Sequence, residues 1–199
     1  MGNLNSVEET ARDSVTQLSN QEKQAIRETW LQFKKQLRTG SVTMFMVLFL
    51  RYPAYQKMFP AFADEPPSEL PKNPRMLAHA LTVAYAITAI VDSLDEPDTT
   101  LELVRKVAVA HALRSPDMKT QFEHMGAAVV DTLIEKLGST MTPTAVAAWK
   151  QLFTFFVTTS EKTFQEVRKR AEQAQQPVSP ALSSKASSSS SDVSKSAGS

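Results

Sequence analysis

The segment Asn73-Pro-Arg-Met-Leu-Ala-His79-Ala-Leu-Thr-Val83 decides how this chain folds. Asn73 followed by Pro74 is typical of a helix start, because asparagine caps free amides and proline fits the first helical turn. Apolar side chains then recur at helical spacing as far as Leu94, with His79 among them. The segment therefore predicts a helix that carries an imidazole in an apolar setting.

A second histidine, His111, has a comparable setting. Thr99-Thr-Leu-Glu102 fits a capping box, and the helix expected after it carries Val104, Val107 and His111 on one face. The two histidines are too far apart in sequence for one helical turn, but two packed helices could bring them to opposite sides of a flat ligand. Imidazole is the commonest side-chain ligand for metals at neutral pH.

The short segment Lys57-Met-Phe59-Pro-Ala-Phe62 lies upstream of both histidines. Two imidazoles that face each other across a slab, with a phenylalanine such as Phe59 against its edge, form the geometry of a haem pocket in an all-helical protein. Phe62 fits a core position better than a ligand contact.

The remaining pattern is also helical, with no alternating strand pattern and no hairpin signal. Ser19-Asn-Gln-Glu22 is a capping box, Ser115-Pro116 and Thr142-Pro143 mark later helix starts, and Gly40 and Gly138 are expected to break helices. Residues 63–74 contain four prolines and predict an irregular loop. The fold class is therefore all-α, with apolar helices over residues 26–37, 42–49, 77–94, 104–111, 122–137 and 146–156.

The two ends differ from this body in composition. Residues 1–17 are polar and are expected to form a flexible extension, and residues 18–170 have the size of one compact domain. Residues 171–199 form a serine-rich tail with almost nothing to bury, which predicts disorder. The mixed charges over residues 166–176 fit the fraying end of the last helix.

Composition excludes several function classes. The formal net charge of +1 argues against a nucleic-acid partner. The absence of cysteine excludes disulfides, thiolate catalysis, iron–sulfur clusters and cysteine zinc sites. The sequence contains no run of about eighteen apolar residues, so it predicts no membrane-spanning helix, and its polar N-terminus does not have the pattern of a secretory signal. We therefore expect a cytoplasmic protein.

Met1-Gly2-Asn-Leu-Asn-Ser6 matches the N-myristoylation pattern, with chance as the alternative explanation. No polybasic patch or cysteine follows it, so an acyl chain on Gly2 would give only weak, reversible membrane association.

In their order and spacing, these segments resemble the globin family over about residues 18–170. The resemblance rests on Trp30, on the run from Leu48 to Phe62, on His79 with Val83, on Ala108-Val-Ala-His111-Ala-Leu, and on Thr142-Pro-Thr-Ala-Val-Ala-Ala-Trp149. The chain is most similar to neuroglobin- and cytoglobin-like members and to invertebrate-type globins with extended termini. The resemblance implies a globin fold of seven to eight helices around a haem pocket.

The same resemblance implies the site residues and the cofactor, haem b. His111 corresponds to the proximal iron ligand, and His79 to the distal histidine, which is also a possible sixth ligand of the iron. Phe59 corresponds to the residue that packs on the haem face, and Val83 and Phe45 to distal pocket residues. Val107 shares the face of His111 and gives an apolar wall beneath the iron. Phe45 has no hydrogen-bond donor, so His79 is the expected side-chain donor to a bound ligand.

Three function classes remain open. The first is reversible binding of dioxygen or another diatomic gas, for storage, supply or sensing. The second is redox signalling or electron transfer by a bis-histidine, six-coordinate haem with a reductant protein as partner. The third is nitric oxide dioxygenation or nitrite reduction. The sequence contains no reductase domain that would support such a reaction, so we do not expect a dedicated enzyme.

Other residues have weaker assignments. Arg114 and Arg75 lie one turn from the two histidines and are candidate partners of the haem propionates. His124 has no evident partner, which favours a surface or half-buried position without a functional role. The run Phe153-Thr-Phe-Phe156 covers more than one helix face, so a homodimer contact is possible.

Overall fold

The computed structural model describes residues 11–175. Within that range the chain forms six α-helices, three short 3-10 helices and no β-strand, so the predicted all-α class is confirmed. The α-helices are α2 (Asn20–Lys34), α3 (Leu37–Arg51), α4 (Pro74–Asp92), α5 (Pro97–His111), α6 (Met118–Leu137) and α7 (Pro143–Gln175). The 3-10 helices are η1 (Pro53–Met58), η2 (Leu70–Lys72) and η3 (Gly138–Thr140).

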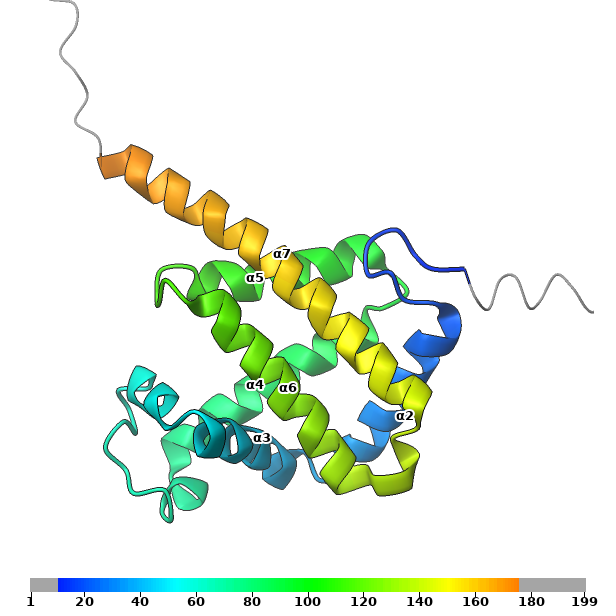
Figure 1. Ribbon diagram of the computed structural model, residues 1–199, viewed down its shortest axis with the longest axis horizontal. Coiled ribbons are helices and arrows are strands. Elements are labelled where there is room, and N and C mark those ends of the chain that lie inside the picture. The colour runs from blue at the N-terminus through cyan, green and yellow to red at the C-terminus, as the bar shows by residue number, and fades with distance from the viewer. Residues whose placement is uncertain (1–10, 176–199) are drawn as a thin grey trace, which may run out of the picture.

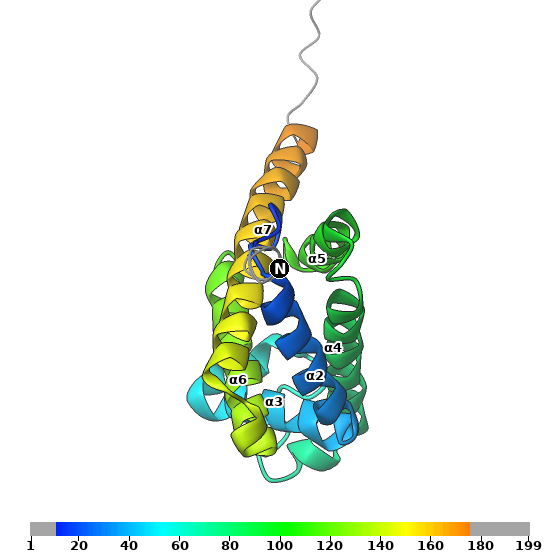
Figure 2. The same cartoon turned by 90° about the vertical axis from the view of Figure 1, so that its right-hand side faces the viewer.

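The helices form two pairs on either side of α2. Figure 2 shows α6 and α7 along one side of the molecule and α4 and α5 along the other, with α2 between them. α7 is the longest helix, and Figure 1 shows it running diagonally across the molecule and past α5. α3 packs against both α4 and α6, and α5 packs against α7. α4 and α5, which carry His79 and His111, thus lie on the same side of the molecule in the view of Figure 2.

Three predicted helix starts are confirmed. Oγ of Ser19 accepts a hydrogen bond from the amide of Glu22 (3.2 Å), and the Glu22 carboxylate accepts from the amide of Ser19 (2.9 Å). Oδ1 of Asn73 accepts from the amides at the start of α4. Oγ1 of Thr142 accepts from the amide of Ala145 at 3.2 Å. Each cap satisfies an amide that the helix itself leaves free.

Two other predicted starts are wrong. α5 begins at Pro97, two residues before the expected capping box, and no side chain caps it. Thr100 is buried inside α5, where its hydroxyl donates to the carbonyl of Ser93 at 2.7 Å. α6 begins at Met118 and not at Ser115-Pro116. Proline at the first helical position determines where α5 begins, because its fixed φ angle suits a helix start.

Gly40 does not break a helix, contrary to the sequence prediction. It lies inside α3, which begins at Leu37. A β-carbon at this position would lie 2.7 Å from Cε2 of Phe33, a fully buried residue of α2. Glycine is therefore required for the close approach of α2 and α3. Gly138 does end α6, and its φ of 51° lies in the left-handed region that favours glycine.

Two tryptophans join α2, α4 and α7 in the core. The fully buried rings of Trp30 and Trp149 lie 5.6 Å apart between centroids. Nε1 of Trp149 donates to the hydroxyl of Thr29 at 2.9 Å, and Nε1 of Trp30 donates to the hydroxyl of Thr88 at 3.0 Å. Both indole N–H groups are thus satisfied inside the core, as buried polar groups need to be.

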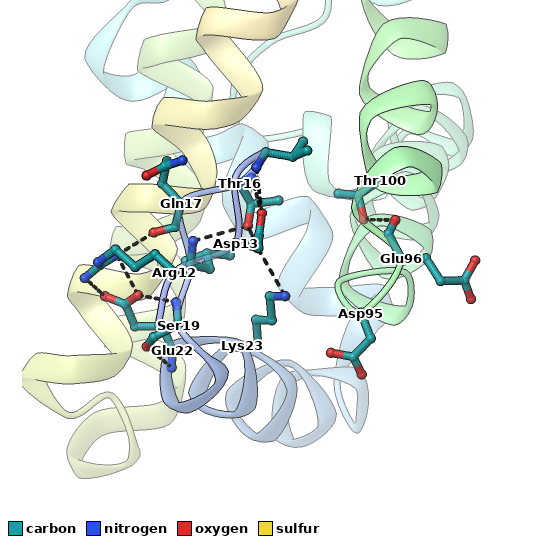
Figure 3. A network of polar contacts seen from close by, with 12 residues as sticks. Arg12, Asp13, Thr16, Gln17, Ser19, Glu22, Lys23, Asp95, Glu96 and Thr100 are labelled. Carbon is teal, nitrogen blue, oxygen red and sulfur yellow. Dashed lines mark hydrogen bonds and ion pairs between the residues drawn. The ribbon is translucent and has the colours of Figure 1, made fainter. Parts of the chain in front are cut away.

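Residues 12–17, which precede the predicted domain boundary at residue 18, have defined contacts with the helices. Figure 3 shows the side chain of Lys23 directed at Asp13, and the two form an ion pair at 3.1 Å with little exposure. Arg12 pairs with Glu22 at 2.8 Å, and Gln151 of α7 donates to the carbonyl of Thr16 at 3.2 Å. These contacts tie the segment before α2 to α2 and α7.

At the other end, α7 continues past residue 170 to Gln175. The described structure therefore extends beyond both predicted bounds of the compact domain, residues 18 and 170. The myristoylation motif at Gly2 and the serine run lie outside the described residues.

By length and composition alone, α4 is the one helix among residues 11–175 that would suffice to cross a membrane. Core helices of soluble proteins pass the same test. α4 packs against α3, α5 and α2 and buries Met76, Ala80 and Ile87 inside the fold.

We predict that Gly40→Ala lowers the free energy of unfolding by about 1–3 kcal/mol, the usual cost of overpacking a core. The added methyl group would collide with the Phe33 ring. Urea denaturation measures the effect, with Thr39→Ala, at an exposed position of the same helix, as the control. Equal stability of Gly40→Ala and the wild type would contradict the close-approach argument.

Candidate functional site

A cavity of about 460 Å³ lies between α4, α5, α6, α7 and the η1 corner. This volume is within the range typical of ligand and cofactor pockets, about 300–1,000 Å³. Its walls are mostly aliphatic and aromatic. All six residues predicted for the site line it: Phe45, Phe59, His79, Val83, Val107 and His111.

His111 is the last residue of α5, and one of its ring nitrogens is already engaged. Nδ1 lies 2.8 Å from the carbonyl oxygen of Val107, one turn earlier. A carbonyl oxygen only accepts, so Nδ1 carries the proton and Nε2 keeps its lone pair. The edge of the Phe122 ring, 5.3 Å away between centroids, packs against the imidazole. This tautomer leaves Nε2 available as a metal ligand.

His79 lies in α4 between two phenylalanine rings. Its ring centroid is 5.2 Å from that of Phe45 and 5.0 Å from that of Phe59, both in edge-on arrangements. Phe45 and Phe59 also contact each other edge-on at 5.9 Å. Val83 lies one turn further along α4 and lines the same cavity. The aromatic contacts hold the imidazole at the cavity wall and give it no polar partner.

The electrostatic environment keeps both imidazoles neutral. Burial lowers the pKa of His79, and the nearby His111 imidazole and the positive charge of Arg114 lower it further. Burial also lowers the pKa of His111; the hydrogen bond to Val107 opposes that effect, and Arg114 adds to it. Neutral imidazole is the form that binds metals. His79, His111 and Arg114 all line the one cavity.

The two candidate arginines differ. Arg114 lines the mouth of the cavity, and its Nε donates to the carbonyl of Ala110 at 3.0 Å. Arg75 does not line the cavity, and its guanidinium lies 3.4 Å from the carbonyl of Ala61. Only Arg114 is therefore placed to meet an anionic group of a ligand in the cavity. Val104, on the same face as His111 in the sequence analysis, is fully buried in the core and does not line the cavity.

Arg168 holds the corner that follows His111, a function the sequence did not indicate. From α7, its guanidinium donates to the carbonyls of Ala112 (3.2 Å), Ser115 (2.7 Å) and Pro116 (3.2 Å). These carbonyls belong to the turn between α5 and α6, which begins directly after His111. The sequence assigned Arg168 to a fraying helix end, because contacts between residues this distant leave no local pattern.

His124 does have partners, so the prediction that it has none is wrong. Nδ1 of His124 lies 2.8 Å from Oη of Tyr55. The imidazole also stacks on the ring of Tyr52, with centroids 3.8 Å apart and an interplanar angle of 5°. Tyr55 itself lines the cavity. The three rings come from the end of α3, from η1 and from α6.

The aromatic run of α7 faces inward. Phe153 and Phe156 line the cavity, and Phe155 is buried in the core. The run therefore forms no exposed patch of the kind expected for a dimer contact. The cavity also receives residues that the sequence analysis did not single out for it: Met58, Met118, Gln121, Phe122 and Met125.

Comparisons with known proteins point in one direction. A family model described as Globin matches residues 42–160. Cytoglobin-2 of Danio rerio is 27% identical over 147 residues, which cover 73% of this chain and 82% of that protein. A globin of Nerita albicilla is 26% identical over 137 residues, which cover 69% and 87% of the two chains.

Two solved structures show the same fold. A hexacoordinated haem protein from an anhydrobiotic tardigrade superposes with a TM-score of 0.71 at 21% identity, covering 77% of this chain and 99% of that one. The haemoglobin of the botfly Gasterophilus intestinalis superposes with a TM-score of 0.69 at 17% identity, covering 74% and 99%. The expected globin fold is confirmed.

The lowered pKa values of His79 and His111 predict acid sensitivity of the protein without added ligand. Between the folded pKa values and the ordinary value of about 6.5, the unfolded chain binds more protons than the folded one. The free energy of unfolding should therefore fall as the pH decreases through this window. Chemical denaturation at pH 7.5 and 5.5 measures the loss, which should be smaller in His79→Leu. An equal loss in both proteins would contradict the burial of His79 in the neutral form.

Proposed function

The chain belongs to the globin family, and on that basis we propose that it holds haem b in the cavity and binds dioxygen reversibly. The observation that carries the proposal is the hydrogen bond from Nδ1 of His111 to Val107, which leaves Nε2 free to ligate iron. His79 lines the same cavity from a different helix, α4. The proposal assigns His111 as the proximal ligand and His79 as the distal residue.

The residues present fit a haem. A porphyrin is flat and largely apolar, and the walls formed by Phe45, Phe59, Val83 and Val107 offer it apolar contacts. Its propionates need a cation, and Arg114 stands at the cavity mouth. Relatives include cytoglobins, and the similar solved structures are described as a haem protein and a haemoglobin. These likenesses support the same cofactor class for this chain.

In this proposal the protein's own side chains have separate roles. Bound haem supplies an iron atom that coordinates diatomic gases. Nε2 of His111 holds that iron, and the Arg168 contacts hold the corner next to His111. The imidazole of His79 is the side-chain donor that faces the ligand side and favours a partly negative ligand atom. Phe45 and Val83 exclude water there, which slows loss of an electron to solvent.

A second candidate function is redox signalling or electron transfer by a six-coordinate haem, with a reductant protein as partner. The observation that favours it is the position of His79, whose neutral imidazole has no hydrogen-bond partner among residues 11–175 and is confined by Phe45 and Phe59. Such an imidazole is available to the iron as a sixth ligand. One similar structure is itself described as hexacoordinated.

Other aspects follow from the sequence and stay proposals. We propose a cytoplasmic protein, with weak membrane association only if Gly2 is acylated. Nitric oxide dioxygenation or nitrite reduction would be a side activity, because His79 is the one cavity side chain suited to acid or base chemistry on the ligand side. A homodimer has no support from the inward-facing phenylalanines of α7.

We predict that His111→Ala abolishes stable haem incorporation, because it removes the tether between protein and iron. Loss of haem should accelerate by more than the roughly 10–100-fold typical of outer-shell substitutions around a metal. Transfer of haem to a scavenger protein, followed by absorbance, measures the rate. His124→Ala, outside the cavity lining, is the matched control and should retain haem. Full, stable haem content in His111→Ala would overturn the proximal assignment.

We predict that His79→Leu retains haem but autoxidises faster, because the variant lacks the donor on the ligand side. The spectrum of the reduced, ligand-free protein separates the two candidate functions. Sharp, split visible bands in the wild type that become one broad band in His79→Leu indicate a six-coordinate iron. A broad band in both proteins would exclude ligation by His79 and with it the bis-histidine alternative. Unchanged autoxidation in His79→Leu would contradict the donor assignment.

A further inference from the structure

Tyr55 lines the cavity and forms a polar pair with His124, which lies outside the cavity lining. It lies in η1 and lines the cavity, and its hydroxyl oxygen is 2.8 Å from Nδ1 of His124 in α6. Among the described residues, which include all three tyrosines of the chain, Tyr55 is the one whose hydroxyl meets a side-chain base. We assign the phenol as donor and Nδ1 as acceptor.

A third ring extends this pair toward the surface. The ring of Tyr52 lies flat against His124, with centroids 3.8 Å apart, and stacks on Tyr55 at 5.2 Å. All three side chains are half-buried, so each also reaches solvent. A continuous set of aromatic rings therefore leads from the cavity wall to the outside of the protein.

The chemistry of a phenol explains what such a pair can do. Removing one electron from a phenol makes its hydroxyl strongly acidic, so oxidation requires a nearby base for the proton. A neutral imidazole is such a base near physiological pH. Burial raises the pKa of Tyr55, as do the charges of Tyr52 and Asp117, so the phenolate does not form in advance. The electron and the proton must then leave Tyr55 together.

We propose that Tyr55 and His124 form a proton-coupled electron relay between the haem cavity and the surface. The inference rests on the proposed haem and adds to it a path for single electrons. When a hydroperoxide has oxidised the haem, Tyr55 gives it one electron. The Oη–H bond of Tyr55 breaks and an N–H bond forms at Nδ1 of His124, which leaves a neutral tyrosyl radical beside an imidazolium.

The cycle closes with a reductant at the surface. A one-electron donor of the ascorbate type returns an electron to the Tyr55 radical, and the proton moves back from Nδ1 to Oη. A second electron from the same donor class reduces the haem. Over the full cycle the hydroperoxide ROOH takes two electrons and two protons and leaves as ROH and water. Tyr55 and His124 end unchanged.

The test uses the full chain loaded with haem and mixed with hydrogen peroxide. Freeze-quenched samples give an electron paramagnetic resonance spectrum in which a tyrosyl radical is expected for the wild type. Tyr55→Phe should lose that signal, whereas Tyr85→Phe, which removes an exposed tyrosine of α4, should keep it. His124→Gln should slow radical formation by roughly 100-fold, the lower end of the effect of a positioned base.

Haem content, measured first by absorbance, separates the possible failures. If the wild-type protein takes up no haem, the proposed function itself is contradicted. Haem-loaded Tyr55→Phe with an undiminished tyrosyl signal would overturn the relay. His124→Gln with wild-type kinetics would remove the base from it.

A second readout does not depend on the haem. Photo-oxidation of the haem-free chain by a ruthenium tris-bipyridine complex should form the tyrosyl radical more slowly in deuterated water, because the proton moves with the electron. The effect should vanish in His124→Gln. An equal isotope effect in both proteins would also contradict the relay.

Discussion

The hydrogen bond from Nδ1 of His111 to the carbonyl of Val107 is the interaction on which the site depends. It fixes the tautomer of the imidazole and directs the lone pair of Nε2 away from its own helix. The geometry is local, because Val107 lies one turn earlier in α5. The hydrogen bond can orient His111 toward the cavity only if the end of α5 keeps its position against the rest of the molecule, and that depends on contacts with other helices.

The length of α7 provides that support. α7 packs along α5, and its penultimate turns bring Arg168 to three carbonyls of the corner after His111. At its other end, α7 is tied to α2 by the Trp149–Thr29 hydrogen bond and to the N-terminal segment by Gln151. One helix therefore links the corner after His111 with the core and with the segment before α2. Loss of any of these ties should act on the site through α7.

Local patterns in the sequence were sufficient for much of this structure. The caps at Ser19 and Asn73 involve neighbouring residues, so their residue types alone identify them. The six predicted cavity residues were found because their order along the chain resembles a family with a known pocket, and all six line one cavity. The roles assigned to them stay predictions until a ligand is bound.

The features that the sequence missed all depend on contacts between distant segments. Gly40 has the composition of a helix break, but the Phe33 ring that requires it belongs to another helix. His124 has no partner near it in sequence, and its hydrogen-bond partner Tyr55 lies 69 residues earlier in the chain. Such pairings depend on how the helices pack against one another, and the spacing of residues within one helix does not indicate that packing.

The central claim is that one imidazole of this chain holds the iron of one haem. Titration of the haem-free full chain with hemin, followed at the Soret band, tests it most directly. We predict a red-shifted band that grows linearly and saturates at one equivalent of hemin. A spectrum that stays that of free hemin, with no saturation, would contradict the account.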